Sequence, residues 1–80
     1  MDIRTAMLRF RLKELIADKQ FKEGRRVTLD EIASATGIHR TTLSKVANQR
    51  GYNASADIID KLCAFFDAEV GDLVVRVSED

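Results

Sequence analysis

The stretch TLDEIASATGIHRTTLSKVANQR, residues 28–50, decides the fold that we expect for this chain. Its first part predicts a short helix over residues 28–36 that begins with a capping box. In that box the Thr28 side chain accepts a hydrogen bond from the backbone N–H of Glu31, and the Glu31 side chain accepts one from the N–H of Thr28. Gly37 then ends the helix, because glycine adopts the left-handed backbone conformation without strain. We therefore expect a tight turn there and a second helix directly after it.

The two sides of that second helix, predicted over residues 39–48, differ in chemistry. At 100° per residue, Leu43, Val46 and Ala47 gather on one side and should face the core. The opposite side is polar and basic, with neither a carboxylate nor a large apolar residue; it consists of Arg40, Thr41, Ser44, Lys45 and Asn48. Such a surface suits DNA phosphates and base edges. A merely hydrated face is the alternative for any amphipathic helix, but the capped helix and the glycine turn before it favour DNA.

The two helices and their turn resemble the helix-turn-helix of the phage repressor and Cro proteins, the XRE-like family, with residues 39–48 as the recognition helix. The resemblance covers residues 8–73 and depends on a helix that starts at Ser55 and on a framework before it: Leu29, Ile32, Ala33, Gly37, Ile38, Leu43 and Val46. It implies an all-α fold, a five-helix lambda-repressor-like bundle. It also implies sequence-specific binding to double-stranded DNA by a bacterial or phage transcriptional regulator, acting as a homodimer on a two-fold operator.

The same resemblance assigns roles to individual side chains. Base edges would be read by Arg40, Thr41, Ser44 and Lys45, with Arg40 suited to a bidentate guanine contact. The DNA backbone would be held by Arg25, Arg26, Thr28, His39, Thr42, Asn48, Gln49 and Arg50. The roles of Arg25 and Arg26 come from their position and not from the resemblance: both stand just before the Thr28 cap, where the helix N-terminus would approach a phosphate, and plain solvation is the alternative. The family commonly has glutamine where this chain has Thr28, and a serine or threonine cap where it has His39, so His39 could cap the helix, bind phosphate when protonated, or stay neutral and solvated.

Three further helices are expected around this pair. Apolar residues at helical spacing predict one over residues 3–19, and Phe21 should anchor the following loop to the core. Ser55 is a good N-cap for a helix over residues 55–66, and a short helix is expected over residues 69–73.

The end of the chain favours a different structure. Its β-branched residues alternate, which predicts a short strand over residues 74–77. A lone strand in a helical chain has no partner, so we expect two copies to pair through Val74, Val75 and Val77. A frayed tail is the alternative.

Composition sets the outer bounds. Eighty residues without proline or a linker indicate one domain, residues 1–80. The net charge is zero, but residues 1–50 hold eleven Lys or Arg and six Asp or Glu, whereas residues 51–80 hold two and seven. The basic half therefore carries the expected DNA surface. The single cysteine, Cys63, falls on an apolar stripe and should be a core residue; it offers neither a disulfide nor a metal site.

Other functional classes fit less well. One histidine, one cysteine and no glycine-rich phosphate loop argue against an enzyme, and we expect no cofactor and no small-molecule ligand. The charged N-terminal residues argue against a signal peptide, so a cytoplasmic protein without membrane contact is expected. The alternative function is the DNA-binding antitoxin or protein-interaction module of a toxin–antitoxin-like pair, with a small protein as partner.

Overall fold

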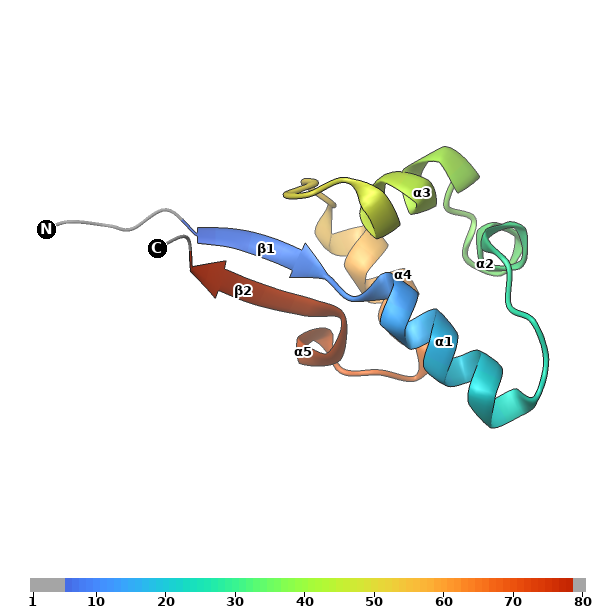
Figure 1. The fold of residues 1–80 in the computed structure, drawn as a ribbon. Helices are drawn as coiled ribbons and strands as arrows, with labels where there is room; N and C mark the ends of the chain where they lie inside the picture. The colour runs from blue at the N-terminus through green and yellow to red at the C-terminus, as the bar shows by residue number, and fades with distance from the viewer. Residues whose placement is uncertain (1–5, 79–80) are drawn as a thin grey trace, which may run out of the picture.

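The computed structural model of the protein describes residues 6–78, which form five helices packed as a bundle and a two-stranded ribbon that projects from it (Figure 1). In chain order the elements are β1 (Ala6–Phe10), α1 (Leu12–Glu23), α2 (Leu29–Thr36), α3 (Arg40–Asn48), α4 (Ala56–Phe66), α5 (Val70–Leu73) and β2 (Val74–Ser78). No helix within this part of the chain is long and apolar enough to cross a membrane.

The ribbon corrects the prediction of a helix over residues 3–19. Residues 6–10 form β1 instead, while residues 3–5 lie outside the described part. β1 pairs antiparallel with β2, so that Met7 lies opposite Val77 and Phe10 opposite Val74. Phe10 and Val74 lie opposite each other and both pack against the core. This cross-strand contact favours a strand over residues 6–10, because a helix there could not pair with β2. The fold is therefore a helical bundle with a small antiparallel sheet, not an all-α fold.

The C-terminal strand has its partner within the chain. Our premise that this segment lacked one was wrong, because β1 lies beside it along all five residues. The backbone N–H of Arg11 continues the connection by donating to the carbonyl oxygen of Leu73 at 2.7 Å. The ribbon is thus joined to the bundle where β1 enters α1 and where α5 enters β2.

Helix α1 extends four residues beyond its predicted end and stops at Gly24. The following loop is held by Gln20, whose side-chain oxygen accepts a hydrogen bond from the N–H of Val27 at 2.9 Å. Phe21 is 91% exposed, so the prediction that it anchors this loop is wrong. Since the helix continues through residue 21, Phe21 lies on its outer face and Val27 is the buried residue of the loop.

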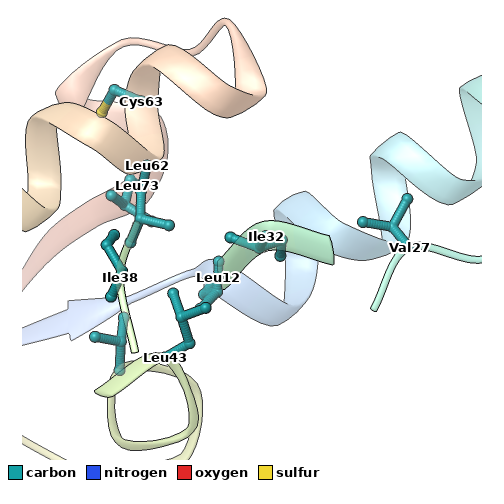
Figure 2. Close-up of a cluster of buried hydrophobic side chains, with 9 residues drawn as sticks. Leu12, Val27, Ile32, Ile38, Leu43, Leu62, Cys63 and Leu73 are labelled. Atoms are coloured by element: carbon teal, nitrogen blue, oxygen red, sulfur yellow. The ribbon is translucent and has the colours of Figure 1, made fainter. Parts of the chain in front are cut away.

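The core draws on every helix. In Figure 2, Leu12 of α1, Ile32 of α2 and Leu43 of α3 point toward one another, and all three are fully buried. The complete set of buried side chains is Leu12, Val27, Ile32, Ile38, Leu43, Val46, Leu62, Cys63 and Leu73. Cys63 is a core residue, as predicted, and burial raises the pKa of its thiol. These contacts fix α2 and α3 against the rest of the bundle.

Candidate nucleic-acid interface

The start of α2 is capped by Thr28. Its hydroxyl oxygen accepts a hydrogen bond from the N–H of Glu31 at 3.2 Å, which confirms one half of the predicted capping box. The other half is wrong, because the Glu31 carboxylate is bound to the Arg25 guanidinium instead of the Thr28 N–H. The Thr28 cap still fixes the residue at which α2 begins.

The turn between α2 and α3 is held by Gly37 and Thr36. Gly37 has φ of 78°, and its N–H donates to the carbonyl oxygen of Ala33 at 2.9 Å. The Thr36 hydroxyl donates to the carbonyl oxygen of Ile32 at 2.7 Å and accepts from the N–H of Ile38 at 3.2 Å. Sequence reasoning missed Thr36, although threonine hydroxyls near a helix end are known to bond to the backbone in this way. The direction in which α3 leaves the turn is therefore fixed.

Helix α3 lies on the outside of the bundle (Figure 1). Its inner side buries Leu43 and Val46, as expected from the helical spacing. On its outer side Arg40, Thr41 and Lys45 are exposed, and Ser44 is half-buried. The side-chain nitrogen of Asn48 donates to the carbonyl oxygen of Ser44 at 3.0 Å and lies 3.4 Å from its hydroxyl. The four expected base-reading residues thus follow one side of a single helix.

The residues flanking that side are placed differently from one another. His39 is the exposed N-cap residue of α3, with no side-chain capping bond, so the capping role considered for it is not realised. Thr42 is half-buried, whereas Gln49 and Arg50 are exposed beyond the end of the helix. His39 and Gln49 therefore mark the two ends of the outer surface of α3.

Asp30 brings a carboxylate to this surface. The Nε atom of Arg40, the first residue of α3, lies 3.2 Å from the Oδ1 atom of Asp30 in the first turn of α2. Both side chains are mostly exposed, at 67% and 75%. The outer side of α3 has no acid of its own, so sequence reasoning along that one helix missed Asp30. The signal was present as an exposed acid at the N-terminus of the preceding helix.

Arg25 is occupied by carboxylates. Its Nε donates to Glu23 at 2.8 Å, and its Nη1 and Nη2 donate to the two carboxylate oxygens of Glu31 at 2.7 and 2.8 Å. The hydrogen bonds from Arg25 lower the pKa of Glu31. A phosphate would have to compete with both acids, which weakens the expected role of Arg25 on the DNA backbone. Arg26 beside it is exposed.

A groove of about 660 Å³ lies between the ribbon and the C-terminal end of α3. Asn48, Gln49 and Arg50, which we predicted to contact the DNA backbone, line this groove. Two basic residues from the start of the chain, Arg9 and Lys13, line it as well. The Nε atom of Arg50 lies 3.2 Å from the sulfur atom of Met7, so the loop that follows α3 contacts β1. Sequence reasoning missed Arg9 and Lys13, because their position depends on the ribbon.

The comparisons with known proteins agree with this geometry. The family model of the Cro/C1-type helix-turn-helix DNA-binding domain matches residues 11–79. The crystal structure of the transcriptional regulator VanUg, form II, is similar with a TM-score of 0.73 and 16% sequence identity, over 99% of this chain and 96% of that one. At that identity the likeness shows a shared fold. No curated protein matches the sequence.

Proposed function

The chain belongs to the Cro/C1-type helix-turn-helix DNA-binding domains, and we propose that it regulates transcription by binding one specific two-fold operator as a homodimer. The observation that carries the proposal is the outer surface of α3, where Arg40, Thr41 and Lys45 are exposed. The opposite side of the same helix buries Leu43 and Val46 in the core. A rigid helix with short polar and basic side chains on its free side fits the major groove of B-form DNA.

The side chains divide into two roles in this proposal. Arg40, Thr41, Ser44 and Lys45 reach base edges, because they share the side of α3 that faces away from the core. The DNA backbone is contacted by residues around them, namely Arg26, Thr28, His39, Thr42, Asn48, Gln49 and Arg50. Lys13 extends that set, since it lines the same groove as Arg50. Arg9 lines the groove as well, but its Nη2 atom lies 3.5 Å from the carboxylate of Glu14, which is also part of the groove. Arg25 acts within the fold, holding Glu23 and Glu31.

The ribbon is the proposed dimer contact. A two-stranded sheet leaves one hydrogen-bonding edge of each strand open, and an isolated ribbon of this length is only marginally stable in water. On β2 the apolar side chains Val75 and Val77 are 38% and 40% exposed, and on β1 Leu8 is 48% exposed. Val75 and Val77 share one face of the ribbon, whereas Leu8, opposite Arg76, lies on the other face. Pairing the outer edges of two β2 strands would give a four-stranded sheet in which the valine faces of the two copies adjoin.

Selection of bound sequences from random duplex DNA tests the function directly. We expect enrichment of a palindromic site whose half-sites are centred about one helical turn, roughly 34 Å, apart. Enrichment of a single, non-repeated half-site would retain sequence-specific binding and overturn the two-fold operator. No enrichment at moderate salt would overturn the proposed function altogether.

A further inference from the structure

We propose that Asp30 is a positioning residue that holds Arg40 for end-on reading of guanine and thereby sets the sequence preference of this protein. The inference rests on the proposed function, because it concerns how one base-reading residue is oriented. It adds a residue from α2, outside the recognition helix, to those that determine specificity.

The geometry of the ion pair carries the first step. The Oδ1 atom of Asp30 lies 3.2 Å from the Nε atom of Arg40, so the carboxylate approaches the guanidinium nearest to its Nε atom. Nη1 and Nη2 together present two parallel N–H groups that match O6 and N7 of guanine, and this pair does not include Nε. A carboxylate beside Nε therefore restrains the arginine side chain and leaves Nη1 and Nη2 available to bind a base.

The neighbouring charges leave this role to Asp30. Glu31, the other acid in the first turn of α2, is held by both Nη atoms of Arg25. Lys45, the other cation on the outer side of α3, is five positions beyond Arg40 and follows it by more than one helical turn. Asp30 and Arg40 thus form a separate pair between the N-termini of the two helices of the motif.

The surroundings decide how strong the pair is. With both side chains largely exposed, it contributes little to the stability of the free protein. Once DNA excludes water from the surface, the same contact strengthens because the local dielectric constant falls. The carboxylate also repels phosphates, so it disfavours positions of the protein on DNA that place a phosphate beside Asp30.

Removing the carboxylate should therefore change two separate quantities, the affinity for unrelated DNA and the discrimination between bases. In Asp30→Asn, loss of repulsion should raise the affinity for an unrelated duplex by about two- to tenfold. Loss of the restraint on Arg40 should at the same time lower the discrimination between guanine and adenine at the Arg40 position, by an amount on the order of tenfold. A simple change of net charge would shift all duplexes alike.

The experiment measures dissociation constants of the full chain for three duplexes: the selected site, the same site with one guanine replaced by adenine, and an unrelated sequence. The guanine is the one whose preference disappears in Arg40→Ala. The matched control is Asp18→Asn, which makes the same charge change at an exposed position of α1 beside the α4–α5 connection. We expect Asp30→Asn to lose discrimination, Asp18→Asn to keep it, and the Asp30→Asn/Arg40→Ala double variant to match Arg40→Ala.

Three results would overturn the proposal. Equal discrimination in Asp30→Asn and Asp18→Asn would reduce Asp30 to a general charge. An additional loss of discrimination in the double variant, compared with Arg40→Ala, would show that Asp30 acts independently of Arg40. A lowered midpoint of thermal unfolding in Asp30→Asn, accompanying the loss, would assign the effect to the fold. Failure of the proposed function is distinguishable from all three, because the wild-type protein itself would then show no preference among duplexes.

Discussion

Gly37 shows how a single residue fixes the turn between α2 and α3. Its φ of 78° lies in the left-handed region, and a Cβ placed there would meet no other atom within 4 Å. Gly37→Ala should therefore lower the free energy of unfolding by backbone strain alone, by about 1–2 kcal/mol. Urea denaturation measures the change. Gly71→Ala is the matched control, since Gly71 has equal space and no positive φ, and it should be neutral or slightly stabilising.

The contacts of Arg25 give a second prediction, on pH. Hydrogen bonds to Arg25 lower the pKa of Glu31, and those to Lys19 and then Arg25 lower that of Glu23. A carboxyl whose pKa is lower in the folded than in the unfolded protein adds stability that is fully present above the unfolded pKa. That stability is lost as the pH falls through the folded pKa. Arg25→Ala should thus be destabilising at neutral pH and progressively less so below about pH 4.5.

Chemical denaturation from pH 7 down to pH 2.5 checks this second prediction. Arg26→Ala is the control, because Arg26 is exposed next in sequence and has none of the carboxylate contacts of Arg25. A destabilisation by Arg25→Ala that stays constant over the whole pH range would contradict the role assigned to these ion pairs.

Residues whose partners lie within one helical turn were predictable. The Thr28 cap and the Gly37 turn follow from local backbone chemistry, and both are present. The Glu31 side chain was assigned to Thr28 by the same rule, but a guanidinium six residues upstream is a stronger partner than a backbone N–H. The loop that brings Arg25 there has no sequence signal. Asp30 was missed for the same reason, since its partner begins the next helix.

At the level of whole elements, the same distinction separates α2, α3 and α4 from β1. The structure has the three helices within about one residue of the predicted bounds, because each has a polar cap position or glycine at an end and an apolar stripe. β1 has apolar residues that fit a helix as well as a strand, and its conformation is decided by β2, far along the chain. Local pattern could not show that pairing.

The recognition helix leads to a third prediction, which compares its two ends. Arg40→Ala should relax the sequence preference, since Arg40 is exposed at the start of α3 and reads a base in the proposed mode of binding. Arg50→Ala, beyond the end of α3, should weaken binding to all duplexes alike and reduce the salt slope by about one. Binding titrations at several salt concentrations separate these two effects. Lys61→Ala on α4, where Lys61 pairs with Asp57, is the control. An equal loss on every duplex for Arg40→Ala would contradict its role.

The whole molecule combines a polarised charge with a projecting ribbon. Residues 1–50 hold eleven of the thirteen basic residues, and the structure places several of them around α3 and the adjoining groove. In the proposed mode of binding, one copy presents only α3 to the DNA, and a single helix of this size makes few base contacts. Two copies held in a fixed relation would bind their half-sites with a large gain in affinity, because the second contact becomes intramolecular.

The last prediction tests whether the ribbon supplies that relation. Replacing Val75 and Val77 of β2 by lysine puts two charges on the partly exposed face of the ribbon, and neither of the replaced residues is fully buried. We expect a monomer by analytical ultracentrifugation and a loss of affinity for the two-fold site that is much greater than the loss for a single half-site. Val70→Lys is the control, because Val70 is 57% exposed but lies on α5. A wild-type protein that is monomeric at the concentrations where it fills both half-sites would contradict the ribbon contact, since the two copies would then meet only on DNA.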